Sequence, residues 1–194
     1  MLKYKVLPIL IMLSAIRLFP VDRLTINVSG NYLLPSNDDF RYYYEKVSIY
    51  PELKIGYRIA KKIYIWGSYS YLSARCIYYR YIDINKFQEI RSTLEYILSL
   101  GVGYQSKLTD SLSYSIEIGF FSLYTKLHKV DDTSNWIKGF QVNTFLTTCR
   151  SKNFYAGIFL GVIGTFESIY LFNGFHSPIQ WEGIKSGLLI GVRL

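Results

Sequence analysis

Apolar and polar residues alternate along much of this chain. The stretch LSYSIEIGFF, residues 112–121, places Glu117 between two isoleucines. Because successive side chains of a β-strand point to opposite faces, this order predicts a strand with one apolar and one polar face. A half-buried sheet in water has the same pattern, so the segment alone leaves open which face is the interior.

Eight runs of this kind follow one another, and each is predicted as a strand. They cover residues 23–34, 47–59, 62–74, 90–104, 112–124, 137–148, 153–165 and 182–194. The inward faces of the third and seventh runs are left open, and the third is apolar or aromatic on both faces.

The lengths of these runs and of their connections indicate a membrane-spanning barrel. A tilted strand needs about 9 to 11 residues to cross a bilayer, and bacterial barrels have even strand numbers. The connections AKK, QSKLTD and RSK are short and alternate with four longer ones. Tight periplasmic turns and long outer loops produce such an alternation. We therefore predict an all-β fold, an eight-stranded antiparallel up-and-down transmembrane β-barrel in a bacterial outer membrane, with its long loops on the cell exterior.

The polar faces of the strands are predicted to line the barrel interior. In lipid the outer face must be apolar, and closure of the sheet satisfies every backbone donor and acceptor. Seven charged residues then point inward, and because buried charges must be paired, we expect an ion-pair network that fills the lumen. They are Glu52, Lys54, Arg58, Glu95, Glu117, Lys185 and Arg193. Such a network blocks free diffusion, and its rearrangement into a narrow ion path is the alternative.

This pattern, from residue 23 to 194, resembles the small eight-stranded bacterial outer-membrane barrels, the family of the OmpA transmembrane domain, OmpX and Ail-like proteins. In the last strand Lys185, Gly187, Ile190 and Val192 look like the signal by which such barrels are recognised for assembly, although the chain ends in Leu194 and not in an aromatic residue. The resemblance implies three partners: outer-membrane lipid with lipopolysaccharide, the barrel assembly machinery, and a host or surface ligand.

The N-terminal residues have the order of an export signal. Lys3 and Lys5 precede an apolar stretch over residues 6–16. We predict a signal peptide at 1–20, with its cut site left open, and a barrel domain at 21–194; a retained helix is the alternative. Loss of residues 1–20 lowers the net charge from +8 to +5. The remaining basic residues are spread along the chain, which argues against a nucleic-acid partner.

Aromatic residues make up 18% of the chain and include 19 tyrosines. Tyrosine suits strands and membrane interfaces. The clusters YYY at 42–44, IYYRY at 77–81 and LFNGF at 171–175 fall in predicted outer loops. They are interpreted as an aromatic girdle with strand extensions or as an adhesive surface, since Tyr and Arg dominate binding hot spots. The candidates for loop binding are Arg41, Tyr42, Tyr43, Tyr44, Tyr78, Tyr79, Arg80, Phe172 and Phe175.

No residue is assigned a catalytic or metal-binding role, and no cofactor is expected. His176, Ser177 and Glu182 include the residue types of lipid A deacylases, but adjacent His and Ser side chains point to opposite faces of a strand. Cys76 and Cys149 are predicted at opposite ends of the barrel, too far apart for a disulfide. We expect a non-enzymatic membrane anchor with loops for adhesion or host contact. The alternatives are a lipid A-modifying hydrolase and a narrow channel or carrier for small or apolar solutes.

Overall fold

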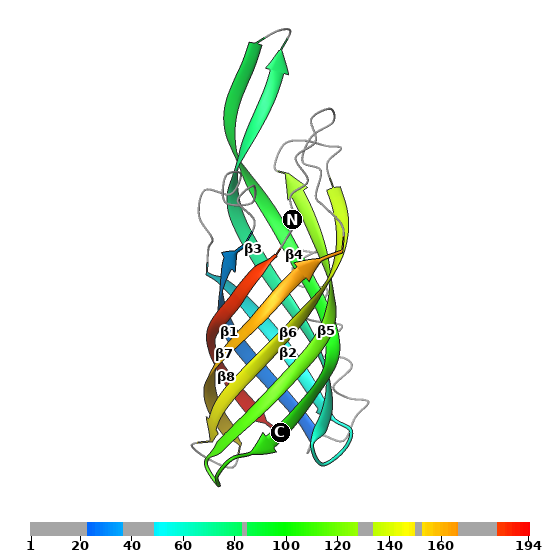
Figure 1. Ribbon diagram of the computed structural model, residues 1–194, viewed down its shortest axis with the longest axis vertical. Helices are drawn as coiled ribbons and strands as arrows, with labels where there is room; N and C mark the ends of the chain where they lie inside the picture. The colour runs from blue at the N-terminus through cyan, green and yellow to red at the C-terminus, as the bar shows by residue number, and fades with distance from the viewer. Residues whose placement is uncertain (1–22, 37–48, 83–84, 128–133, 150–152, 167–181) are drawn as a thin grey trace.

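Eight antiparallel strands form a closed barrel in the computed structural model (Figure 1), as the sequence predicts. The structure describes residues 23–36, 49–82, 85–127, 134–149, 153–166 and 182–194, and the side chains of all of these except 74–82, 85–94, 126–127 and 134–135. The strands are β1 Leu24–Pro35, β2 Tyr50–Arg58, β3 Ile63–Ile82, β4 Asn85–Lys107, β5 Leu112–Leu127, β6 Ser134–Cys149, β7 Phe154–Thr165 and β8 Gly183–Arg193. Over the described ranges no helix is long and apolar enough to cross a membrane.

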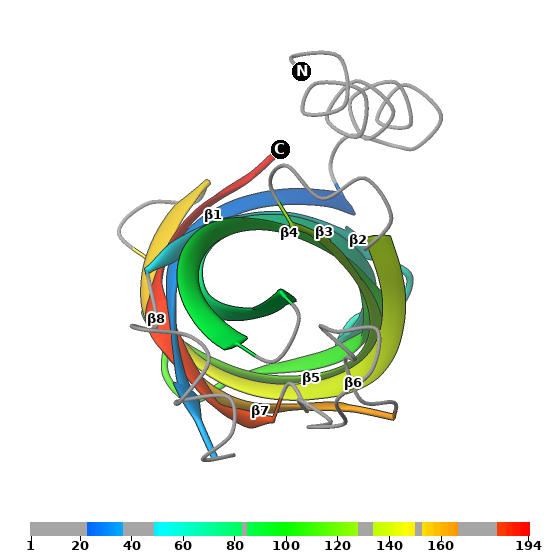
Figure 2. The ribbon, with the colours of Figure 1, turned by 90° about the horizontal axis from the view of Figure 1, so that it is seen from above.

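The barrel closes where the first strand meets the last. β1 pairs with β8 from Thr25↔Arg193 to Pro35↔Gly183, and β1 pairs with β2 on its other side. Viewed along the barrel, the strands form a continuous ring (Figure 2). Closure leaves no free sheet edge in this ring, which is the condition for a β-structure to cross a lipid bilayer.

The two ends of the barrel differ. Residues 59–62, 108–111 and 150–153 connect β2 to β3, β4 to β5 and β6 to β7 at one end, called here the short-turn end. At the second of these turns the Leu112 amide donates to the Thr109 hydroxyl at 3.0 Å. The opposite end, called the long-loop end, carries the longer connections 36–49, 128–133 and 166–182.

One predicted long connection is mostly strand. The segment 76–89 is predicted as a connection, with strand extensions as one interpretation of its tyrosines, and its backbone continues the β3–β4 ladder as far as the pair Ile82↔Asn85. Beyond Ser70, β3 is no longer paired with β2, and before Thr93, β4 is not yet paired with β5. The hairpin therefore runs on as two strands, and it projects beyond the long-loop end (Figure 1). Its β-branched and aromatic residues favour extended backbone over a loop.

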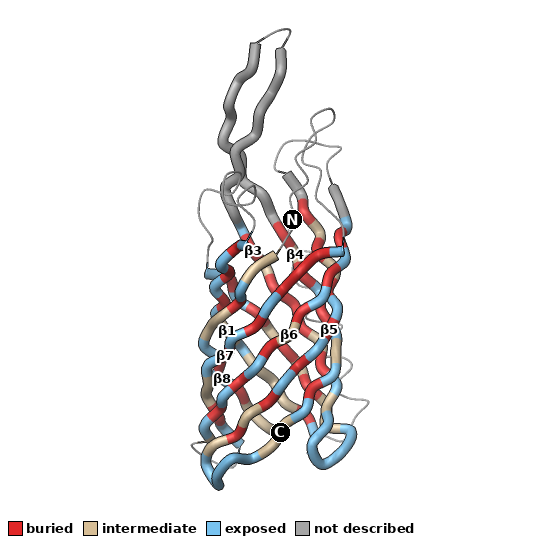
Figure 3. Tube along the Cα trace, viewed as in Figure 1, coloured by how far each residue is buried: buried red, intermediate tan, exposed pale blue. Residues whose placement is uncertain are grey.

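Buried and exposed residues alternate along every strand (Figure 3). The outward positions are apolar, as a bilayer requires. They include Val28, Leu100, Val102, Ile118, Phe120, Ile158, Leu160, Leu188 and Ile190. The faces that the sequence left open are now assigned: Trp66 and Ser68 of β3 and Tyr155 and Phe159 of β7 point inward.

The inward face of the barrel is predicted to be polar, but it also carries large apolar side chains. Toward the long-loop ends of their strands, large apolar side chains close the lumen with at most 4% of their surface exposed: Leu33, Leu72, Ile97, Phe121, Leu123, Ile137 and Ile163. Toward the short-turn end, Phe145, Tyr155, Phe159 and Leu189 pack as a second cluster. Four charged residues lie between these two apolar groups: Glu52, Lys54, Glu117 and Lys185.

Candidate functional site in the barrel interior

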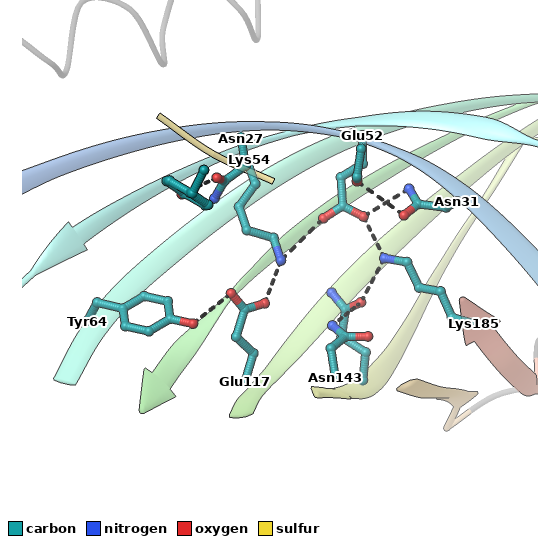
Figure 4. A network of polar contacts seen from close by, with 11 residues as sticks. Asn27, Asn31, Glu52, Lys54, Tyr64, Glu117, Asn143 and Lys185 are labelled. Atoms are coloured by element: carbon teal, nitrogen blue, oxygen red, sulfur yellow. Dashed lines mark hydrogen bonds and ion pairs between the residues drawn. The ribbon is translucent and has the colours of Figure 1, made fainter. Parts of the chain in front are cut away.

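A chain of ion pairs crosses the lumen between the two apolar groups (Figure 4). The Lys54 ammonium lies 2.5 Å from Glu117 Oε2 and 3.7 Å from Glu52 Oε1. The Lys185 ammonium lies 2.5 Å from Glu52 Oε2. β2, β5 and β8 thus supply two acids and two bases whose charges cancel, and each charge has a partner of opposite sign.

Neutral polar groups complete the coordination of these carboxylates. Tyr64 donates its hydroxyl to Glu117 Oε1 at 3.0 Å, and Asn31 donates its amide to Glu52 Oε2 at 3.2 Å. Lys185 also donates to Gln141 Oε1 at 3.5 Å. A desolvated charge is tolerated only when paired and hydrogen-bonded, and this arrangement meets both conditions.

Aromatic rings surround the two ammonium groups. Lys54 Nζ lies 4.8 Å from the centre of the Trp66 ring and 4.5 Å from that of Phe145. Lys185 Nζ lies 6.0 Å from the Tyr50 ring and 5.5 Å from the Phe159 ring. A ring face attracts a cation, so these contacts stabilise the lysines on the sides that carry no carboxylate.

Inward-facing glycines make room for the largest of these rings. A Cβ at Gly101 of β4 would lie 2.7 Å from the Trp66 ring, and one at Gly119 of β5 would lie 2.5 Å from it. The indole therefore lies against bare backbone across two neighbouring strands. This is a specific packing reason for glycine at both positions.

The structure places the seven predicted lumen residues in two groups. Glu52, Lys54, Glu117 and Lys185 form the chain of ion pairs, and Glu95 is fully buried on the inward face of β4. Arg58 and Arg193 lie apart from that chain and line a cavity of about 50 Å³ at the short-turn end. The Arg193 guanidinium lies 5.2 Å from the Tyr155 ring centre.

The aromatic lining of the lumen escaped the sequence-based prediction. Tyr50, Trp66, Phe145 and Tyr155 point inward beside the charges. Tyr155 also donates its hydroxyl to Asn27 Oδ1. The period-two pattern carried a signal for Tyr50, Trp66 and Phe145, because each has the parity of a polar residue two positions away on its strand. Tyr155 has only Gly157 at that spacing within β7.

Most of the predicted loop-binding residues lie outside the described part of the chain. This holds for Arg41, Tyr42, Tyr43, Tyr44, Phe172 and Phe175, and for His176 and Ser177 of the hydrolase alternative. Tyr78, Tyr79 and Arg80 belong to β3, where the backbone alone is described. Glu182 directly precedes β8 and is partly buried.

The two cysteines lie outside the chain of ion pairs. Cys149 is free and ends β6 at the short-turn end. Cys76 belongs to the projecting part of β3, and its side chain lies outside the description. Within the described ranges, no three His, Cys, Asp or Glu residues are grouped as metal ligands.

The outer surface carries aromatic rings at both ends of its apolar band. Neighbouring ring centres at the long-loop end lie 5.0–6.4 Å apart and belong to Tyr69, Tyr71, Tyr96, Tyr124 and Trp136. At the short-turn end the rings of Tyr104 and Tyr114 lie 6.4 Å apart. Two aromatic belts that flank an apolar band are typical of outer-membrane barrels.

Solved structures share this architecture. The N-terminal β-barrel domain of Pseudomonas aeruginosa OprF superimposes with a TM-score of 0.55 at 14% identity, covering 88% of this chain and 96% of that one. The chain has the fold of the small eight-stranded outer-membrane barrels. Neisserial surface protein A matches this chain with a TM-score of 0.52 at 11% identity, covering 88% and 96% of the two chains.

A third barrel of this kind is known with a ligand. Ail, the attachment invasion locus protein of Yersinia pestis, solved in complex with the heparin analogue sucrose octasulfate, matches with a TM-score of 0.50 at 12% identity, covering 88% of this chain and 95% of that one. No family model matches the sequence of this chain, and no curated protein matches it.

Proposed function

We propose that this outer-membrane barrel is a non-enzymatic surface protein of a bacterium, in which the barrel is an anchor and the β3–β4 hairpin contacts an acidic ligand outside the cell. The observation that carries the proposal is the continuation of the β3–β4 ladder to Ile82↔Asn85, beyond the pairing of either strand with β2 or β5. The long-loop end then faces the exterior.

The interior supports an anchor better than a channel. The lumen is filled by ion pairs at mid-barrel and by buried leucine, isoleucine and phenylalanine side chains toward the long-loop end. In an eight-stranded barrel the side chains are large enough to fill the interior. The part of the molecule available for contact is therefore the projecting hairpin.

The hairpin sequence favours an acidic partner. Residues 75–91 hold four basic residues, Arg75, Arg80, Lys86 and Arg91, against Asp83 and Glu89. Tyr78, Tyr79 and Tyr81 flank Arg80 in the sequence, and Tyr and Arg are enriched in binding hot spots. Ail, which has the same fold, was solved with a sulfated ligand. A sulfated polysaccharide is thus the first ligand class to test.

The register of the hairpin allows a clean test. Ala74 pairs directly with Thr93, so residues 75–92 can be replaced by Asn-Gly, which forms the tight turn that joins two paired strands. We expect the purified wild-type barrel to bind immobilised heparin and the shortened variant to lose that binding. The control, Lys61→Gln at the short-turn end, is expected to bind like the wild type.

Equal binding by the shortened and wild-type proteins would refute a role for the hairpin. Electrophoretic mobility of unboiled samples in SDS shows whether each variant has folded, so loss of binding is separable from loss of the barrel.

A further inference from the structure

The cavity at the short-turn end has a polar and basic lining to which every strand contributes. It occupies about 50 Å³ and includes Arg58, Tyr64, Gln105, Tyr155 and Arg193. Small-molecule pockets usually have volumes of about 300–1,000 Å³, so this cavity accommodates one small group and excludes a whole nucleotide or sugar.

The balance of charge in the lining is positive. Lys54, Arg58 and Arg193 face it, against the single carboxylate of Glu117. That carboxylate is already occupied by the Lys54 ammonium at 2.5 Å and the Tyr64 hydroxyl at 3.0 Å. Among the described residues, neither arginine forms an ion pair with a carboxylate.

The two arginines belong to β2 and β8, the strands on either side of β1. Thr25 of β1 lies opposite Arg193 of β8 and opposite Gly56 of β2, two positions before Arg58. Thr25 donates its hydroxyl to the Gly56 carbonyl at 3.2 Å. Thr25, Arg58 and Arg193 occupy inward-facing positions of their strands. Both guanidinium groups therefore line the same cavity.

Aromatic neighbours restrict the movement of these guanidinium groups. The Tyr155 ring lies 5.2 Å from Arg193, and its hydroxyl is held by Asn27. Tyr64 is directly opposite Arg58 in the β2–β3 ladder, and its hydroxyl is held by Glu117. Both tyrosine donors are thus used within the protein. The two guanidinium groups are the charged donors of the lining that form no ion pair among the described residues.

We propose that this cavity binds a small oxyanion, a phosphate or carboxylate group, between Arg58 and Arg193. A guanidinium offers paired N–H donors in the geometry of two oxyanion oxygens. Partial burial strengthens that attraction by lowering the local dielectric constant. The site is at the opposite end of the barrel from the β3–β4 hairpin and does not depend on the surface role proposed above.

Calorimetric titration of the refolded full chain in non-ionic detergent at low ionic strength tests the proposal. The probes are sodium phosphate and sodium acetate, added separately. We expect saturable binding of one anion per barrel for at least one of them. Arg58→Gln and Arg193→Gln should each weaken it about tenfold or more, which is the effect of losing one charge-assisted hydrogen-bonding group.

Lys61→Gln is the matched control, because it removes one positive charge from the neighbouring β2–β3 turn outside the cavity. It should leave the dissociation constant within about twofold of the wild type, since an exposed charge is screened by solvent and salt. The proposal is overturned if neither anion binds, or if Lys61→Gln weakens binding as much as the two arginine variants do. Heat-dependent mobility in SDS shows that each variant has folded.

Discussion

Lys54 and Glu117 are 63 positions apart in the sequence, and their charged groups meet at 2.5 Å inside the barrel. Lys54 belongs to β2 and Glu117 to β5, so the ion pair spans the lumen between strands that are not neighbours in the sheet. This contact joins two walls of the barrel across the lumen.

Removal of the charge on Glu117 should destabilise the barrel. Glu117→Gln leaves the Lys54 ammonium with Glu52 at 3.7 Å, and Glu52 already pairs with Lys185. We expect a loss of about 3 kcal/mol in the free energy of unfolding, the usual cost of removing one partner of a buried ion pair. The measurement is the urea unfolding midpoint in detergent micelles. Asp110→Asn in the exposed β4–β5 turn is the control, and equal stability of both variants would contradict the prediction.

A methyl group at Gly119 should disturb the lumen packing. Its Cβ would lie 2.5 Å from the Trp66 ring and 2.6 Å from the Leu100 carbonyl oxygen, so either the indole or the backbone must move. Gly119→Ala is expected to cost about 1–3 kcal/mol, as overpacking does. At the outward-facing Gly30 the nearest atom is an Ile49 methyl at 3.8 Å. Gly30→Ala should therefore unfold like the wild type, and a greater loss at Gly30 than at Gly119 would refute the prediction.

A single charged substitution tests whether the apolar outer band faces lipid. Leu100 lies outward on β4, midway between Tyr96 and Tyr104 of the two aromatic belts, and is 69% exposed. Leu100→Arg should cost about 2–4 kcal/mol in lipid vesicles, whereas Leu108→Arg at the short-turn end should cost at most about 1 kcal/mol. Unfolding titrations in vesicles measure both values. Similar costs at the two positions would mean that Leu100 does not face the middle of a bilayer.

The filled lumen also predicts that the protein does not conduct ions across a bilayer. The ion pairs of Lys54 and Lys185 and the buried apolar residues toward the long-loop end occupy the lumen at their levels. The wild-type protein in planar bilayers should therefore show no sustained conductance steps. Regular steps of one size in most insertions would favour the channel alternative.

Period-two patterning was sufficient to predict the barrel, because a lipid-facing surface enforces apolar residues at alternate positions of every strand. Glu117 shows this well: its isoleucine neighbours face out, and it faces in. The pattern did not assign an inward face where bulky residues occupy both faces of a strand. The inward face of β3 is set by Trp66 against Gly101 and Gly119, a contact between strands that no local pattern contains.

Two other features depended on contacts that are distant in sequence. Arg58 and Arg193 have the inward parity predicted for them, but among the described residues they join no ion pair, and they line a cavity instead. The length of the β3–β4 hairpin was missed because tyrosines and isoleucines near a predicted loop suit either a membrane girdle or a strand. Twenty paired positions in that ladder resolve the ambiguity.

Closure of the barrel between β1 and β8 is the central claim, and a cysteine pair tests it most directly. Val28 and Ile190 are direct partners with outward side chains. Directly opposed residues of antiparallel strands have Cα atoms about 4.5–5.5 Å apart, which is within the range of a disulfide. The substitutions Val28→Cys and Ile190→Cys are made in a background with Cys76→Ser and Cys149→Ser, and the protein is oxidised in lipid vesicles.

We predict that this pair forms an intramolecular disulfide in nearly every molecule, seen as a shift of the monomer band on non-reducing gels. The pair Val28→Cys and Ile118→Cys, with the second residue on β5, should form none, because β5 pairs only with β4 and β6. Absence of the Val28–Ile190 disulfide, or equal cross-linking by both pairs, would contradict a closed barrel.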